Sequence, residues 1–246
     1  MEVEFPFFYR EKKGVWVDGE ICIISGNGTA TDLMDCKELS KAIPGWYGFM
    51  KLVSSTPIRN IGTIAGNLVN ASPIGDLTIL LLALDAELVL KNREEVERNV
   101  PLRSFYKGYK KMDMQESEWV DRISFSIPDE DLFNFEKVSK RKYLDIASVN
   151  SAIRVKAEGR VMSEVSCSIG GVAAVPLYLE RVSAFLKGKE VDAGRVLDAV
   201  EILQKEISPI SDARGSADYK RLLASQLFKA HFISLFPTVV KMEHVL

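Results

Sequence analysis

The sequence predicts an α+β protein of two consecutive domains, residues 1–130 and 131–246. Strand and helix patterns are mixed in the first domain, whereas the second domain has its strands first and its helices afterwards. The helical segments of the second domain lie near residues 176–187, 193–206 and 216–235. Such segregation is typical of a small antiparallel sheet covered by helices. The acidic stretch at residues 129–132, after which the strand pattern starts again, marks the boundary.

Length and composition are those of a folded globular chain. Of the 246 residues, 47% are hydrophobic and 27% are charged, which excludes a disordered, collagen-like or disulfide-scaffold protein. The chain has 32 basic and 34 acidic side chains and a net charge of -2, so no global positive field attracts nucleic acid or an anionic membrane. We therefore expect a small-molecule or protein partner and no nucleic acid.

The sequence contains no candidate membrane span. Its longest apolar run, residues 77–84, lies between two aspartates and is shorter than the roughly 20 residues that a spanning helix needs. The first residues also lack the apolar segment of a secretory signal. We therefore expect a cytoplasmic protein.

The cysteines and histidines do not form a metal or hydrolase motif. Cys22, Cys36 and Cys167 are widely spaced without a C-x-x-C pair, so we expect all three to be reduced and structural. His231 and His244 both lie near the C-terminal end, where a Ser/His/Asp triad would lack local support.

Local patterns predict the elements of the first domain. Residues 15–24 alternate around an Asp-Gly turn signal, which favours a β-hairpin. Residues 31–43 have apolar side chains at helical spacing until a Pro-Gly pair, and residues 45–53 are predicted as a second, irregular helix. Further strands are predicted at residues 87–90, 96–100 and 122–127, and in the second domain at residues 133–138, 149–155 and 161–169.

The segment between these helices and strands is rich in small residues. From Pro57 to Asp76 it shows no helical period, so we expect loop and tight strand there. Ser72 and Pro73 supply an N-cap and a first-turn proline for a helix that runs to about Leu84. Because this helix is apolar on all sides, it should be buried all round.

The most informative motif is Thr63-Ile64-Ala65-Gly66-Asn67, followed by NASPIGD. Small residues let a backbone approach a bulky anion, and the N–H groups and dipole of a helix N-terminus attract phosphate. The segment lacks the G-x-G-x-x-G dinucleotide fingerprint and a Walker lysine. By themselves these residues leave two interpretations open, a phosphate or cofactor wall and a tight structural loop.

The same residues, taken with further segments in order, resemble the FAD-binding (medium) subunit of the molybdenum hydroxylases. That family includes the medium subunit of carbon monoxide dehydrogenase and the flavin domain of xanthine dehydrogenase. The resemblance spans about Gly19 to His231. Its segments are RNIGTIAGNL (59–68), NASPIGD (70–76), LLALDAELVL (81–90), VPL with FYKG (100–108), FEKV (135–138), DIA (145–147), GGVA (170–173) and SPISDARGSADY (208–219).

The resemblance implies a fold, a cofactor and partners. It implies a vanillyl-alcohol-oxidase-like FAD domain followed by a C-terminal domain of small antiparallel sheet plus helices. FAD would receive electrons from the iron–sulfur clusters of a partner and pass them to NAD or another acceptor. The implied partners are a molybdopterin-binding large subunit and a [2Fe-2S] small subunit.

The resemblance also assigns site residues. Residues 63–67 match the loop that contacts the FAD phosphates and ribose. Asp76 matches an acid that approaches the cofactor, although it could simply be a first-turn charge of a helix. Lys137 matches a cofactor-binding lysine, although it could be solvated. For Arg214 we expect a capping or interdomain role rather than a ligand role.

The resemblance does not include the leading subdomain of the family, whose glycine-rich loop wraps the FAD pyrophosphate. Only residues 1–18 stand in its place, and we interpret GNGTATDL (26–33) as structural. The FAD domain is therefore expected to be partial. Two alternative hypotheses stay open, namely a flavin-free scaffold subunit that docks the molybdenum and iron–sulfur subunits, and a stand-alone flavoprotein oxidoreductase.

Overall fold

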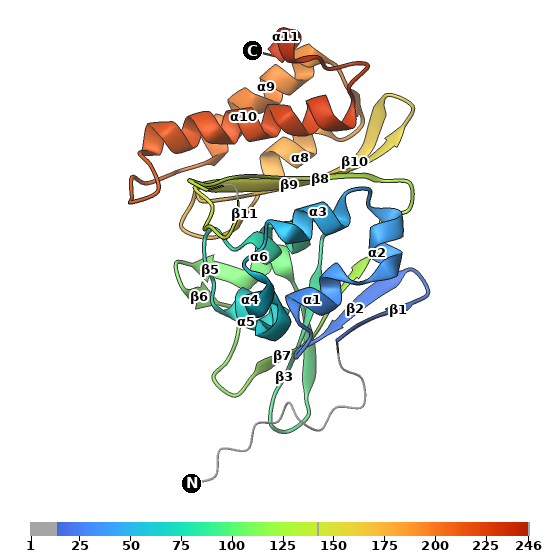
Figure 1. Ribbon diagram of the computed structural model, residues 1–246, viewed down its shortest axis with the longest axis vertical. Helices are drawn as coiled ribbons and strands as arrows, with labels where there is room; N and C mark the ends of the chain where they lie inside the picture. The colour runs from blue at the N-terminus through green and yellow to red at the C-terminus, as the bar shows by residue number, and fades with distance from the viewer. Residues whose placement is uncertain (1–13, 142, 246) are drawn as a thin grey trace.

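The computed structural model describes residues 14–141 and 143–245 (Figure 1). In this part of the chain, the first sheet has the strand order β1-β2-β7-β3-β4 and is antiparallel throughout. Its strands are β1 (Val15–Asp18), β2 (Ile21–Ser25), β3 (Glu87–Lys91), β4 (Glu97–Pro101) and β7 (Trp119–Ser126). The β1–β2 hairpin confirms the prediction for residues 15–24.

Short helices connect the strands of this first sheet. They are α1 (Ala30–Met34), α2 (Lys37–Ala42), α3 (Trp46–Lys51), α4 (Thr56–Ile61), α5 (Ile64–Val69), α6 (Asp76–Ala83) and α7 (Leu102–Phe105). A small hairpin of β5 (Tyr106–Gly108) and β6 (Lys111–Met112) follows α7. The predicted irregular helix at residues 45–53 is present as α3.

The second sheet is also antiparallel and has the order β11-β10-β9-β8, with β12 paired to β10. Its strands are β8 (Leu132–Val138), β9 (Val149–Glu158), β10 (Val161–Gly170), β11 (Leu177–Tyr178) and β12 (Lys189–Glu190). The helices of this half are α8 (Glu180–Leu186), α9 (Ala193–Glu206), α10 (Ala217–Leu235) and α11 (Met242–Val245), and the two-residue strand β12 lies between α8 and α9. The predicted order of strands first and helices afterwards therefore holds for the three predicted strands, β8, β9 and β10.

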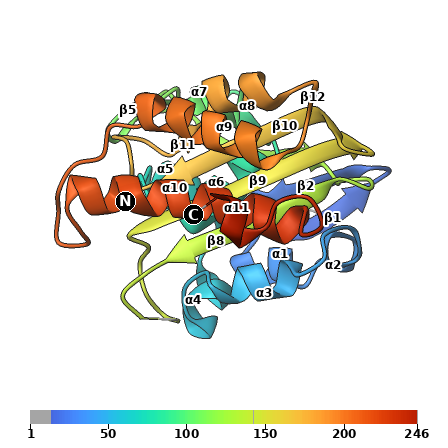
Figure 2. The same ribbon diagram turned by 90° about the horizontal axis from the view of Figure 1, so that it is seen from above.

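The second sheet is the central layer of the molecule. Helices α8 and α10 pack on one face, whereas α6 packs on the other against β9 and β10, as Figures 1 and 2 show. Phe133 and Phe135 of β8 face the first core, where they meet the rings of Trp46 and Phe49. Burying such a side chain contributes about 1.5–3 kcal/mol, so this contact joins the two halves strongly.

Helix α6 confirms the expectation of a helix buried all round. Every residue from Leu77 to Ala83 is buried, because the helix lies between the second sheet and the helices α5 and α7. Its N-terminus was predicted wrongly. The helix begins at Asp76 with Gly75 as its N-cap, and the Pro73 carbonyl instead accepts a hydrogen bond from the Gly171 backbone at 2.9 Å. This long-range contact holds residues 72–75 outside the helix.

Two other predictions were wrong. Residues 57–70 are the helices α4 and α5 rather than loop and tight strand, and each helix has only six residues, too few to show a 3.6-residue period. The predicted helix at residues 176–187 begins only at Glu180, because Leu177 and Tyr178 pair with the edge of β10. In both places a tertiary contact or a cap decided the local structure.

The described residues include all three cysteines and all the helices named above. All three cysteines are free and buried. No helix among the described residues is long and apolar enough to cross a membrane.

Candidate functional site

The motif at residues 63–67, here called the flavin segment, forms the first turns of α5. Thr63 is the N-cap, and its hydroxyl accepts a hydrogen bond from the Gly66 backbone at 3.1 Å. The Ile64 backbone N–H donates to the Gly28 carbonyl at 2.9 Å, and the Ala30 N–H donates to the Gly62 carbonyl at 3.1 Å. The GNGTATDL segment therefore supports the start of α5, which agrees with its structural interpretation.

The flavin segment presents a small, uncharged surface. Ile64 and Ala65 are buried in the core, whereas Gly66 is exposed. A Cβ atom at Gly66 would lie 2.8 Å from the Thr63 hydroxyl, so a side chain there would disturb the cap. Asn67 accepts a hydrogen bond from the Thr78 hydroxyl at 3.4 Å through its amide oxygen, which leaves its amide nitrogen as a donor for a ligand.

Arg59, which opens the family motif, has a structural role. Its guanidinium donates to the carbonyls of Val53 and Ser54 at 2.7 and 2.8 Å and to the Thr56 hydroxyl at 2.9 Å. The side chain is buried and therefore fixes α4 against the end of α3.

Asp76 and Lys137 form a buried ion pair between the two halves of the molecule. Lys137 Nζ on β8 lies 2.6 Å from Asp76 Oδ2 on α6, and it also donates to the Leu52 carbonyl at 2.8 Å. The side chain of Lys137 is only 3% exposed and that of Asp76 only 13%, so Lys137 is not solvated and Asp76 is not a free first-turn charge. Burial raises the pKa of Asp76, while the Lys137 ammonium and the Asn150 amide oppose that rise.

The structure brings the predicted site residues into one cluster. Asn67 contacts Thr78 of α6, and a Cβ on Gly75 would lie 3.3 Å from the Asn67 amide oxygen. The flavin segment therefore lies beside the turn that carries Asp76. Lys137 joins this cluster through Asp76 rather than through the flavin segment.

A cavity of about 650 Å³ adjoins this cluster. We call it the interdomain cavity, because its walls come from the 70–74 turn, the β5–β6 turn and the C-terminal half. Its lining includes Ser72, Ile74, Tyr109, Lys110, Gly171 and Arg214. Lys110 hydrogen-bonds to the backbone carbonyl of Asn70, which ties the β5–β6 turn to the end of α5. Lys110, Arg214 and Lys220 give the cavity positive groups, and Asp212, which lies near Arg214 and Lys220, gives it a negative one.

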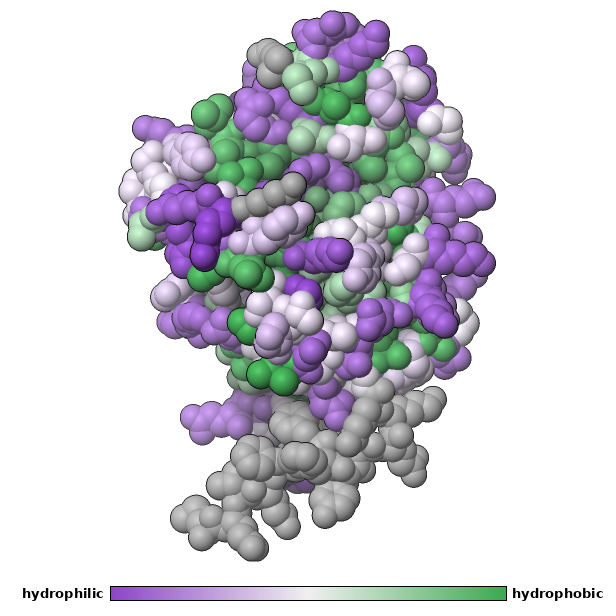
Figure 3. All heavy atoms as spheres, viewed as in Figure 1, coloured by the Kyte–Doolittle hydropathy of each residue, from purple (hydrophilic) through white to green (hydrophobic). Residues whose placement is uncertain are grey.

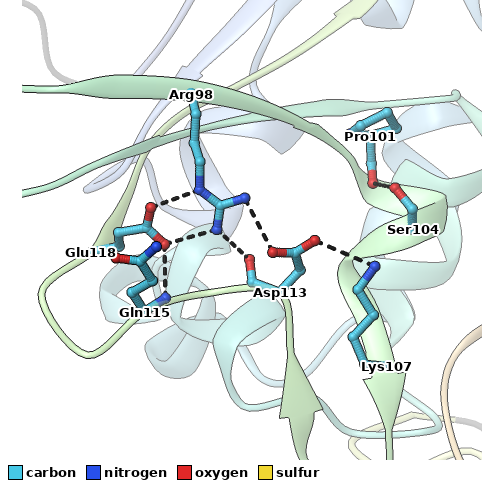
Figure 4. Close-up of polar contacts among 7 residues, drawn as sticks. All are labelled: Arg98, Pro101, Ser104, Lys107, Asp113, Gln115 and Glu118. Carbon is cyan, nitrogen blue, oxygen red and sulfur yellow. Dashed lines mark hydrogen bonds and ion pairs between the residues drawn. The ribbon is translucent and has the colours of Figure 1, made fainter.

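The β5–β6 turn is also anchored from its other side (Figure 4). The Arg98 guanidinium holds both oxygens of Glu118, at 2.7 and 2.9 Å, and its Nη1 reaches Asp113 at 3.1 Å. Lys107 of β5 lies 3.3 Å from the same Asp113. These contacts to Arg98 lower the pKa of Glu118 and fix the chain that follows β6.

Sequence reasoning missed several residues of this cluster. Asn150 of β9 is buried and hydrogen-bonds to Asp76, and its only local signal was a polar side chain within an apolar strand. The Tyr106 hydroxyl donates to the Leu68 carbonyl at 3.0 Å, and burial raises its pKa. Among the described residues, the hydrogen bonds and the ion pair of Arg214 all lie within the C-terminal half and cap no helix. Its carbonyl accepts from Ser148 at 3.0 Å, and its guanidinium lies 3.8 Å from Asp212.

The donor set fits a nucleotide cofactor better than a metal. Within residues 14–141 and 143–245 no group of three or more His, Cys, Asp or Glu could hold a metal ion. The flavin segment instead offers bare backbone at the exposed Gly66 and the side-chain amide of Asn67, with no acidic side chain among its five residues. The backbone N–H groups of Ile64, Gly66 and Asn67 already donate to Gly28 and Thr63. Bare backbone and a side-chain amide suit phosphate and ribose oxygens.

Two families match consecutive parts of the sequence. Residues 13–129 match the FAD binding domain in molybdopterin dehydrogenase, and residues 135–235 match the CO dehydrogenase flavoprotein C-terminal domain. Xanthine dehydrogenase 1 of Arabidopsis thaliana is 31% identical over 75% of this chain, which spans only 14% of that relative. The carbon monoxide dehydrogenase medium chain of Hydrogenophaga pseudoflava is 27% identical over 89% of this chain and 76% of its own length.

Solved structures have the same architecture. Carbon monoxide dehydrogenase from Hydrogenophaga pseudoflava superposes with a TM-score of 0.85 at 26% identity, over 92% of this chain and 79% of that chain. Quinoline 2-oxidoreductase from Pseudomonas putida 86 gives a TM-score of 0.80 at 22% identity, which shows a shared fold. The family models and the fold together thus define an FAD-binding α+β protein. The chain belongs to the FAD-binding medium subunits of the molybdenum hydroxylases.

Proposed function

We propose that this chain holds FAD along the flavin segment and transfers electrons from the iron–sulfur clusters of a partner to NAD or another acceptor. One observation carries the proposal. The flavin segment and the interdomain cavity are joined by the residues between α5 and α6 (70–75). A cofactor on one side of these residues and an acceptor on the other would therefore lie close together. The residues proposed to hold FAD are Thr63, Ile64, Ala65, Gly66, Asn67, Asp76 and Lys137.

The chain itself supplies binding and orientation. FAD, when bound, supplies the electron-carrying chemistry, and no acid or base of the protein is required for that step. Gly66 allows close approach to the backbone and Asn67 offers its side-chain amide as a donor, while Ile64 and Ala65 anchor the segment in the core. Asp76 and Lys137 hold the neighbouring turn. The positive groups of Lys110 and Arg214 suit the phosphates of a dinucleotide acceptor at the cavity.

Assembly, domain division and location complete the proposal. The proposed partners are a molybdopterin-binding large subunit and a [2Fe-2S] small subunit. Residues 1–130 and 131–246 are proposed as separate domains of a cytoplasmic protein.

Hydrophobic side chains gather on the upper half of the face in Figure 3, over the C-terminal helices. Ile58, Ile61 and Ile210 are also more than half exposed. Such apolar surface suits subunit contacts.

An FAD titration of the chain, followed by quenching of flavin fluorescence, tests the site. Asn67→Asp keeps the oxygen that accepts from Thr78 but replaces two amide donors with a negative charge beside the phosphates. A lost charge-assisted hydrogen bond is worth about 1.5–3 kcal/mol, so affinity should fall roughly 10- to 150-fold. Asn92→Asp is the matched control, because it makes the same charge change in the β3–β4 turn and keeps its bond from Val96.

Two outcomes would contradict the proposal. Equal FAD affinity of Asn67→Asp and Asn92→Asp would remove the flavin segment from the site. No FAD binding by the parent chain, together with co-purification of the molybdenum and iron–sulfur chains, would favour the flavin-free scaffold instead.

A further inference from the structure

The turn at residues 72–76 is held by the C-terminal sheet at three points. Lys137 of β8 binds Oδ2 of Asp76, and the Gly171 backbone at the end of β10 donates to the Pro73 carbonyl at 2.9 Å. Between them, Asn150 of β9 reaches both Asp76 and Ile74. Strands of the C-terminal half therefore set the position of a turn that belongs to the first half.

Asn150 makes the most specific of these contacts. Its Nδ2 donates to Asp76 Oδ1 at 2.6 Å and to the Ile74 carbonyl at 3.2 Å, so its two amide hydrogens match two acceptors of the turn. The residue is fully buried. The opposite amide orientation would place Oδ1 against the carboxylate of Asp76, so the charge of Asp76 dictates the orientation that is seen.

Asn150 is packed closely against the end of β10. Its Oδ1 is buried without a hydrogen-bond partner among the described residues. Such an unpaired oxygen lowers the stability of the fold, and the two hydrogen bonds of Nδ2 to the turn offset this loss. A Cβ atom at Gly170 would lie 2.2 Å from this oxygen and 3.0 Å from the Pro73 carbonyl. The glycine of β10 therefore allows Asn150 and the turn to approach closely.

The position of the turn matters on both of its sides. Ser72, Pro73 and Ile74 line the interdomain cavity, whereas Gly75 lies beside the amide of Asn67 in the flavin segment. A shift of the turn would therefore change the cavity and the flavin segment together.

We propose that Asn150 is a positioning residue that sets the 72–76 turn, through Asp76 and Ile74, for cofactor binding at the flavin segment. This inference rests on the proposed function of the flavin segment. Asn150 acts through the turn and needs no contact with the cofactor itself. The charged groups that bond within this cluster are Asp76 of α6 and Lys137 of β8.

The test compares Asn150→Leu with Ser168→Ala in the full chain. Ser168 is buried on β10 and donates to the Ile79 carbonyl of α6 at 2.7 Å, so its variant removes an interdomain hydrogen bond without touching the turn. Asn150→Leu should weaken FAD binding by about tenfold or more and should speed amide hydrogen exchange in residues 74–78 of the apoprotein. Ser168→Ala should bind FAD like the parent.

Asn150→Asp gives a second, nearly isosteric variant in case the leucine variant does not fold. It places a second carboxylate against Asp76, so FAD affinity should be lowest at pH 8 and should recover toward pH 5, where the pair shares a proton. The parent should show no such recovery. A merely structural role would lower stability without this pH profile.

The failures can be told apart. If the parent binds FAD and both Asn150 variants bind it as tightly as Ser168→Ala, the positioning role is wrong. If the parent binds no FAD, the proposed function fails, and unchanged exchange in residues 74–78 of Asn150→Leu would overturn the positioning role as well.

Discussion

The two halves of the molecule differ in the length of their helices and strands and in what stabilises them. Helices α1 to α5 have five or six residues each, and their shape depends on caps and neighbours, as at Thr63. In the C-terminal half, β9 and β10 have ten residues each and α10 has nineteen. Helices shorter than about 12–15 residues are marginal alone in water. The short elements carry the proposed site, and the long elements hold it in place.

Removing Lys137 should break this arrangement most strongly. Lys137→Met leaves the buried Asp76 carboxylate without its cation, and breaking a buried pair costs about 3–5 kcal/mol. Because the pKa of Asp76 then rises further, the loss of stability should be largest at high pH and smaller as pH falls and Asp76 is protonated. Denaturant unfolding at several pH values measures this effect.

The double variant Lys137→Met with Asp76→Leu is the control. It removes both charges and should recover much of the stability, because no uncompensated charge stays buried. A double variant as unstable as Lys137→Met would show that packing of the lysine, rather than the ion pair, joins the two halves.

His231 should make the C-terminal half sensitive to acid. Its Nδ1 accepts from Asn134 and its Nε2 donates to Ser151, each at 3.0 Å, and burial lowers its pKa from 6.5 to about 3. Between these values the unfolded chain binds a proton that the folded chain does not, so stability should fall by up to about 1.4 kcal/mol per pH unit as pH drops.

His231→Gln keeps polar groups for both partners and removes the titration. It should lower stability at pH 7 but flatten the slope between pH 6.5 and 4, as measured by denaturant unfolding. The same slope in both proteins would assign the acid sensitivity to other groups.

Loss of a helix cap should affect FAD binding in the first half of the molecule but not in the C-terminal half. Thr63→Ala and Ser216→Ala each remove a hydroxyl that caps a helix, at α5 and at α10, and each should cost about 1 kcal/mol. Only Thr63→Ala should also weaken FAD binding, because only α5 carries the flavin segment. Equal FAD affinity of the two variants would contradict a dependence of the site on its cap.

The smallest effect is expected at the surface network beside β5. Arg98→Met removes the two-point contact with Glu118 and should cost about 1 kcal/mol or less, with a smaller effect at high salt. Lys107→Met removes only an exposed contact and should leave the melting temperature unchanged. A large effect of either variant on FAD affinity would make this network part of the site.

Patterns in the amino-acid sequence were enough to predict most elements and to recognise the family. The alternation around Asp18 and Gly19 predicted the first hairpin, because side chains on a strand alternate between two faces. The run at residues 77–84, which is apolar except for Thr78, predicted a fully buried helix, and the ordered motifs identified the flavin family. Each of these features depends on neighbours in sequence or on residue order, which a single chain displays directly.

The contacts among the site residues depend on the packing of distant segments and could not be predicted from local patterns. Lys137 lies 61 positions after Asp76, and Asn150 lies 74 positions after it, so no local period could pair them. Helices α4 and α5 are too short to show a period, and the residues before α6 bond to Gly171 and Asn150, far along the chain. A sequence pattern shows which face of an element is buried, but the partner on that face is chosen by packing of distant segments.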